Sequence, residues 1–241
     1  MPLLSNIFGC QNFFKKSDTK ITIILLLAAL IPTLHQYFGV TSFFYKLIPS
    51  DSSIATESVA VGYFFLTAFF LMGIIPFLLI KIVFKEKLLN YGLQLGDWKK
   101  GLYAVGVLFP IIAIAFLLPA AFQEEINTFY PLYKGADKNA VSFLNFELIR
   151  GLFFYSAWEF FFRGFILFGI RNSVNDWTAI LIQTIPSCLW HIGYPTGEIL
   201  MSIPAGIMFG IIALRTNSII WVWLLHWLIG IGLDFFIILV S

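Results

Sequence analysis

Long apolar runs, separated by short charged or turn-forming segments, dominate the pattern of this chain. Most runs approach or exceed the roughly 20 residues that a helix needs to cross a bilayer. Boundaries drawn where polar residues interrupt give seven runs, near 21–40, 59–84, 102–122, 142–170, 178–191, 199–214 and 219–240. The run 142–170 is either one tilted helix or an interfacial turn followed by a helix. The pattern predicts an all-α, polytopic transmembrane bundle of about seven to eight helices, forming one membrane domain over residues 1–241.

Composition points the same way. Apolar residues make up 59% of the 241 residues and charged residues only 12%, whereas about a quarter of a soluble domain is charged. The formal net charge is +2, and no basic cluster is interleaved with aromatics, so nucleic acid is not an expected partner. The two cysteines, Cys10 and Cys188, indicate neither a disulfide framework nor a cysteine metal site.

The distribution of lysine and arginine predicts the orientation, because cytoplasmic loops carry the excess of these residues. An inside amino terminus puts most of them on the cytoplasmic side. That inner set is Lys15, Lys16, Lys20, Lys81, Lys85, Lys87, Lys99, Lys100, Arg171 and Arg215, and the outer set is Lys46, Lys134 and Lys138. We therefore expect an integral protein of the bacterial plasma membrane with a cytoplasmic amino terminus and membrane lipid around it. The run 21–40 is interpreted as an anchor, not as a removed signal peptide.

Two further segments have a structural interpretation. Ser202, Gly206 and Gly210 recur every four residues, which favours close contact with another helix. The lysine-rich segment 81–101 is either an amphipathic stretch in the lipid headgroup layer or a plain cytoplasmic loop.

Ionisable residues inside the apolar runs are the candidates for chemistry, since a charge at the centre of a span costs roughly 3 kcal/mol on insertion scales. They are Glu159, Arg163, His191 and His226, with Asp234 on the last run. Glu159 and Arg163 are four apart and can pair on one helix face, so a structural ion pair is one interpretation. A rise of about 1.5 Å per residue puts Glu159, His191 and His226 at depths where they could share one cavity.

A carboxylate and two imidazoles in an apolar cavity are the groups that general acid–base chemistry on water requires. The same groups could form the proton relay of a transporter, although the sequence has no half-to-half repeat. A zinc site would be expected to show the HExxH spacing, which is missing. Neither a metal nor another cofactor is predicted.

The three segments that carry these residues resemble the CAAX prenyl protease and bacteriocin-processing (CPBP, Abi-like) family of intramembrane glutamic endopeptidases. The segments are WEFFFRGF with Glu159, SCLWH ending at His191, and RTNSIIWVWLLHWLIGIGLD with His226. Their order and separation fit over residues 142–240, which we interpret as a protease-like core. The resemblance implies that a glutamate and the first histidine activate water, while the second histidine and an asparagine stabilise the oxyanion.

Three positions depart from the family pattern. Trp158 stands where the first of two adjacent glutamates is expected, Ser187 where a phenylalanine is expected, and Gly230 where the asparagine is expected. The mechanism that the resemblance implies therefore needs other residues at two places.

Three carboxylates offer a replacement. Glu159 could act if its helix were rotated, Glu198 could reach back across the HIGYPTGE turn, and Asp234 could stand in for the asparagine. Glu198 has a simpler interpretation, as a carboxylate favoured at a helix amino terminus. The predicted catalytic residues are Glu159, His191 and His226, with Arg163, Glu198 and Asp234 as supporting or alternative residues.

The predicted function is that of an intramembrane endopeptidase acting on a peptide or protein substrate. The sequence does not decide whether this substrate is membrane-bound or prenylated. A non-catalytic immunity or binding protein of the same fold is the first alternative. A proton-coupled transporter is the second.

Overall fold

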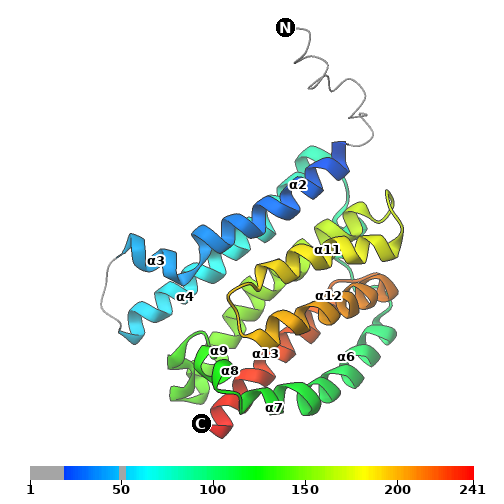
Figure 1. Ribbon diagram of the computed structural model, residues 1–241. Coiled ribbons are helices and arrows are strands. Elements are labelled where there is room, and N and C mark those ends of the chain that lie inside the picture. Colours follow the sequence, from blue (N-terminus) through cyan, green and yellow to red (C-terminus); the bar gives the residue numbers. More distant parts are fainter. Residues whose placement is uncertain (1–18, 49–52) are drawn as a thin grey trace.

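The computed structural model describes residues 19–48 and 53–241, and within these ranges every regular element is a helix (Figure 1). Cys10, Lys15 and Lys16 lie outside the described residues. The predicted all-α polytopic bundle is confirmed: six helical rods are long and apolar enough to cross a membrane. These rods are Thr19–Gly39, Ile54–Phe84, Trp98–Ala121, Ala140–Phe168, Thr196–Thr216 and Ile220–Val240.

Several rods combine α-helical and π-helical segments. The α-helices of the bundle are α2 (Thr19–Leu34), α3 (Thr41–Leu47), α4 (Ile54–Ala68), α5 (Ile75–Leu78), α6 (Trp98–Ile112), α7 (Leu118–Ala121), α8 (Glu124–Phe129), α9 (Ala140–Ile149), α10 (Ser156–Glu159), α11 (Asp176–Trp190), α12 (Thr196–Thr216) and α13 (Ile220–Val240). Many of these helices begin at a small polar residue that lies between two apolar runs. Asp97, Asn139 and Asn175 each accept a backbone N–H at the start of α6, α9 and α11.

The rod Ala140–Phe168, made of α9, α10 and the π-helical segments around them, is the centre of the bundle. In the most apolar 18-residue stretch of this rod, 83% of the residues are buried, against 22–33% in the corresponding stretches of the other five rods. This rod covers nearly all of the run 142–170, so the run forms one continuous helix and not a turn followed by a helix. The first part of this helix is exposed at Val141 and Leu144, whereas residues 157–168 are all buried. Because protein surrounds this later part, it can carry charged side chains that lipid would not tolerate.

The predicted run 178–191 forms α11, which has only 15 residues. At about 1.5 Å per residue, α11 falls short of a full crossing of the hydrocarbon core. It ends at Trp190, and a turn at 191–195 leads directly into α12. His191 therefore lies at a helix end inside the protein.

The contact of α11 with α12 depends on the small-residue stripe, as predicted. A Cβ atom on Gly206 would lie 2.8 Å from Cγ2 of Thr184, and one on Gly210 would lie 3.0 Å from Ile180. The amide of Gln183 donates to the Gly206 carbonyl at 2.9 Å. The two helices thus form a close pair that fixes the turn between them.

The two ends of the bundle differ in charge. At one end Lys20 pairs with Glu86 at 2.7 Å, and the Asp97 N–H donates to the Thr216 carbonyl at 2.8 Å. Burial alone would raise the pKa of Glu86, but hydrogen bonds from Lys20 and Tyr91 outweigh it and hold the pKa below its usual value. The connection at this end, residues 85–97, contains a single 3-10 turn and is otherwise a loop, while residues 81–84 and 98–101 belong to the flanking helices.

At the opposite end the connection between α7 and α9 covers the α11–α12 turn. Glu125 accepts the Thr196 N–H at 2.9 Å, and the Lys134 N–H donates to Glu57 at 3.1 Å. This end carries the outer lysines of the predicted orientation.

Candidate active site

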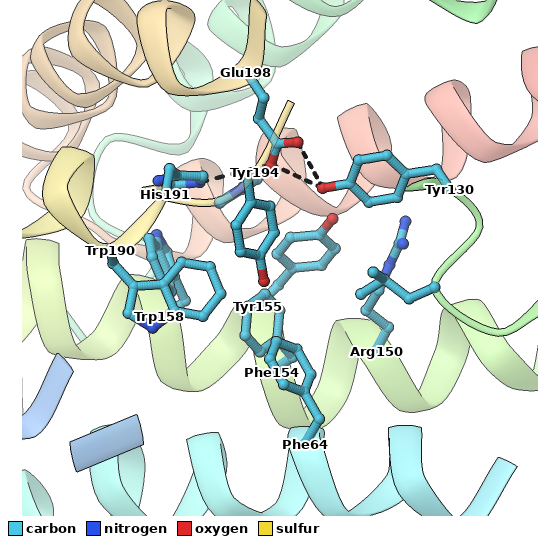
Figure 2. Close-up of a pocket in the computed structure, with 12 residues that line it drawn as sticks. Phe64, Tyr130, Arg150, Phe154, Tyr155, Trp158, Trp190, His191, Tyr194 and Glu198 are labelled. Carbon is cyan, nitrogen blue, oxygen red and sulfur yellow. Dashed lines mark hydrogen bonds and ion pairs between the residues drawn. The ribbon is translucent and has the colours of Figure 1, made fainter. Parts of the chain in front are cut away.

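A cavity of about 40 Å³ lies between the central helix, the α11–α12 turn and α13, with the α7–α9 connection over it (Figure 2). A single water needs roughly 10–15 Å³ of such volume, so the cavity has room for a few water molecules. Twelve residues line it: Phe64, Tyr130, Leu132, Arg150, Phe154, Tyr155, Trp158, Trp190, His191, Tyr194, Glu198 and His226. Two histidines and a glutamate from three different elements therefore face one small space.

His191 and Glu198 face each other across the α11–α12 turn. Nε2 of His191 lies 3.7 Å from Oε1 of Glu198, which is beyond direct hydrogen-bond distance. Nδ1 of His191 is 2.8 Å from the Ser187 carbonyl, and a carbonyl only accepts, so we assign the ring proton to Nδ1. Nε2 then presents a lone pair to a carboxylate oxygen. A water molecule that bridges the two can donate one hydrogen bond to each and keep its own lone pairs free.

Tyr130 holds Glu198 in this position. Its hydroxyl donates to the carboxylate and lies 2.8 Å from each oxygen. Burial, together with the negative charge of Glu198, raises the pKa of Tyr130 well above its usual value. Tyr130 thus keeps its proton and remains a donor.

Glu159, Arg163 and His226 form a second group, behind the cavity wall. Oε1 of Glu159 is 2.6 Å from Nδ1 of His226, and Nη1 of Arg163 donates to the same oxygen at 3.3 Å. Glu159 has no exposed surface and does not line the cavity. It therefore contacts His226 and not His191, and leaves Nε2 of His226 as the ring nitrogen available to a ligand.

Trp158 occupies the cavity wall beside His191, at the position where the family resemblance expects a glutamate. Its ring packs against Phe162, Trp190 and His191 at centroid distances of 4.5, 4.8 and 5.5 Å. The carboxylate that faces His191 comes instead from Glu198 on the neighbouring helix.

Asp234 lies in a buried cluster with Arg150 and Glu147. Nη1 of Arg150 donates to Asp234 at 3.0 Å, and its Nη2 is 3.2 Å from a Glu147 oxygen. Asp234 does not line the cavity, whereas Arg150 does. Asp234 therefore acts on the cavity only through Arg150.

Sequence reasoning missed Arg150, Glu147 and the cavity tyrosines. Arg150 and Glu147 are charges inside an apolar run, three residues apart, so the rule that selected Glu159 and Arg163 would also have selected them. Tyr130, Tyr155 and Tyr194 gave no such signal, because tyrosine is as common in membrane-interface belts as in active sites.

Among residues 19–48 and 53–241, no group of three histidine, cysteine, aspartate or glutamate side chains is arranged to hold a metal ion. His191 and Glu198 offer two ligands, and the groups nearest to them are tyrosines and tryptophans.

These features define a class, a helical membrane protein with paired carboxylates and imidazoles around an internal cavity. Residues 142–231 match the family model of the Rce1-like type II CAAX prenyl endopeptidases. The match covers the segment that carries the three motifs, so the resemblance predicted from them is confirmed. Searches of curated proteins and of solved structures found no match. The family match indicates a CAAX-protease-type intramembrane endopeptidase.

Proposed function

We propose that this protein hydrolyses peptide bonds with a water molecule held between Glu198 and His191. The observation that carries the proposal is the 3.7 Å gap between a carboxylate oxygen and an imidazole nitrogen, in a cavity of water-sized volume. Two acceptors at this distance attract a proton donor between them. Glu198 replaces the glutamate that is missing at Trp158.

The reaction begins when the bound water attacks the substrate carbonyl carbon and passes a proton to Glu198. The tetrahedral intermediate then collapses, the carbon–nitrogen bond breaks, and the proton on Glu198 moves to the leaving amine. General acid–base catalysis of this kind contributes about 10²–10⁴-fold. His191 holds the water in place through Nε2.

His226 supports the developing oxyanion in this proposal. Its ring faces the same cavity, and when protonated it can donate from Nε2. Glu159 and Arg163 position the ring through Nδ1. Glu159 is thus a positioning residue in this scheme, and the choice of Glu198 over Glu159 as the base rests on which carboxylate faces His191.

An apolar groove supports a substrate that carries a hydrophobic segment or chain, whether membrane-bound or prenylated. The groove lies between α2 and α11 and has a volume of about 730 Å³. Its lining is mainly aliphatic, and Trp190 lines both the groove and the cavity. An apolar group in the groove would therefore lie one side chain away from the proposed water.

A non-catalytic binding or immunity protein of the same fold is the second candidate. The observation that favours it is the size of the cavity, which holds water but not a peptide. Catalysis requires the α7–α9 connection or the α11–α12 turn to move when substrate binds.

Cleavage of a peptide library by detergent-purified protein tests the proposal. We expect cleavage by the wild type that persists in the presence of a chelator. Glu198→Gln and His191→Ala should each lower kcat by about 10²–10⁴-fold. Glu124→Gln is the matched control, because Glu124 is an exposed carboxylate outside the cavity.

Three results would contradict this assignment. Full activity of Glu198→Gln with loss in Glu159→Gln would move the base to Glu159. Cleavage abolished by the chelator would replace the proposed mechanism by a metal-dependent one. A folded wild type that cleaves no peptide of a broad library would favour the binding protein.

A further inference from the structure

Two side chains, Tyr155 and Arg150, meet at Gly230, one turn after His226 on α13. A Cβ atom placed on Gly230 would overlap the hydroxyl of Tyr155 and come within 2.5 Å of Nη2 of Arg150. The absence of a side chain at this position therefore lets both groups approach the α13 backbone. The space that an asparagine side chain would fill is taken by a phenol and a guanidinium.

The Tyr155 hydroxyl is a donor without an acceptor. In the part of the chain that the structure describes, no hydrogen-bond partner lies within reach of it, whereas Tyr130 in the same cavity donates to Glu198. Tyr155 lines the cavity, and Figure 2 shows its hydroxyl directed into it, toward the side where Tyr130 and Glu198 lie. A hydroxyl at the cavity wall without a protein acceptor is available to donate to water or to a bound ligand.

The surroundings of Tyr155 fix its ring and supply positive charge. The ring centres of Tyr155 and His226 are 4.5 Å apart, and the Arg150 guanidinium lies 5.3 Å from the Tyr155 ring centre. Arg150 is itself held by Asp234 at 3.0 Å. A negative oxygen beside the Tyr155 hydroxyl would thus face a hydroxyl donor backed by a buried cation.

We propose that Tyr155 is a catalytic residue whose hydroxyl donates to the oxyanion of the tetrahedral intermediate, beside His226. This inference rests on the proposed hydrolysis. When water attacks the carbonyl carbon, the π electron pair moves onto the carbonyl oxygen, and the Tyr155 O–H donates a hydrogen bond to that oxygen without transferring its proton. The donor does not depend on the protonation state of His226, because the hydroxyl carries its proton either way.

The test is Tyr155→Phe, which removes one oxygen atom and no hydrogen bond within the protein. We expect kcat to fall about 10²–10³-fold, the cost of losing one oxyanion donor, with KM nearly unchanged. The affinity for a phosphinic peptide, which mimics the tetrahedral oxyanion, should fall by a similar factor. The midpoint of thermal unfolding should not change, and Tyr133→Phe is the control for a tyrosine hydroxyl outside the cavity.

The outcomes separate this inference from the proposed function. Cleavage by the wild type with unchanged kcat and phosphinate affinity in Tyr155→Phe overturns the role of Tyr155 alone. Loss of substrate and phosphinate affinity together, with a lower unfolding temperature, assigns Tyr155 a structural role and also overturns it. A wild type that cleaves nothing overturns both proposals.

Discussion

Trp158 shows how one side chain can change the geometry of a site. Its indole is 2% exposed and packs against Phe162, Trp190 and His191. This position on the central helix is therefore filled by an aromatic contact, and the carboxylate at His191 has to come from another helix. Glu198 meets that need because the α11–α12 turn brings it to within 3.7 Å of Nε2.

Trp158→Glu, which recreates the family pattern, should therefore damage this protein and not activate it. The change removes a large buried aromatic, which typically costs about 3–5 kcal/mol when truncated to alanine, and it puts a carboxylate among aromatic rings. We expect a lower midpoint of thermal unfolding in detergent and no gain in peptide cleavage. Trp158→Phe should lose less stability. A Trp158→Glu variant that is stable and more active would show that Glu198 does not serve as the base.

The candidate site could be predicted in part, because a charge in an apolar run is conspicuous in the sequence. That rule selected Glu159, Arg163, His191 and His226, and the structure places all four in or directly behind one cavity. The rule could not tell which carboxylate faces which histidine. That pairing depends on helix rotation and on the 191–195 turn, which are set by packing between helices and not by spacing along one.

The paired helices α11 and α12 form the unit that holds the proposed water. His191 follows the last residue of α11, Glu198 lies in the first turn of α12, and the two helices touch through Gly206 and Gly210. A change in their separation moves the carboxylate away from the imidazole. Small residues in the middle of α12 therefore affect chemistry near its amino terminus.

Gly206→Val tests this connection. Its Cβ would lie 2.8 Å from Thr184, so the two helices must separate. Overpacking of this kind costs about 1–3 kcal/mol. We expect a lower unfolding midpoint and a fall in cleavage, measured on the same detergent preparation. Gly106→Val on α6 is the matched control, because nothing lies within 4 Å of a Cβ at that exposed position. Equal effects at both glycines would indicate only the valine's poor helix propensity.

The positions of the helices along the chain could be predicted better than their places in the bundle. Each apolar run contains a helix, since a chain in lipid has to satisfy its backbone hydrogen bonds internally. The short α11 was also predicted, because the apolar run 178–191 corresponds closely to the helix Asp176–Trp190. The central position of Ala140–Phe168 could not be predicted, because this segment is a long apolar run like the others, apart from its charged residues.

The two ends of the bundle differ in their content of lysine, and this difference bears on the side from which substrate reaches the cavity. The loop 85–97 and the start of α13 meet at the lysine-rich end, where the Ile219 N–H donates to the Gly92 carbonyl at 2.9 Å. Tyr130 and Leu132, which line the cavity, belong to the connection at the opposite end. Under the predicted orientation, the cavity lies beneath the outer connection and substrate approaches it from outside the cytoplasm.

Thiol labelling of single-cysteine variants measures this orientation. Lys87 and Lys138 are both exposed and lie at opposite ends of the bundle. In a background where Cys10 and Cys188 are replaced by serine, an impermeant maleimide added to right-side-out vesicles should label Lys138→Cys. It should label Lys87→Cys only after permeabilisation, because cytoplasmic loops carry the excess of lysine. Labelling in the reverse pattern would place the α7–α9 connection in the cytoplasm, and substrate would then have to reach Glu198 and His191 from that side.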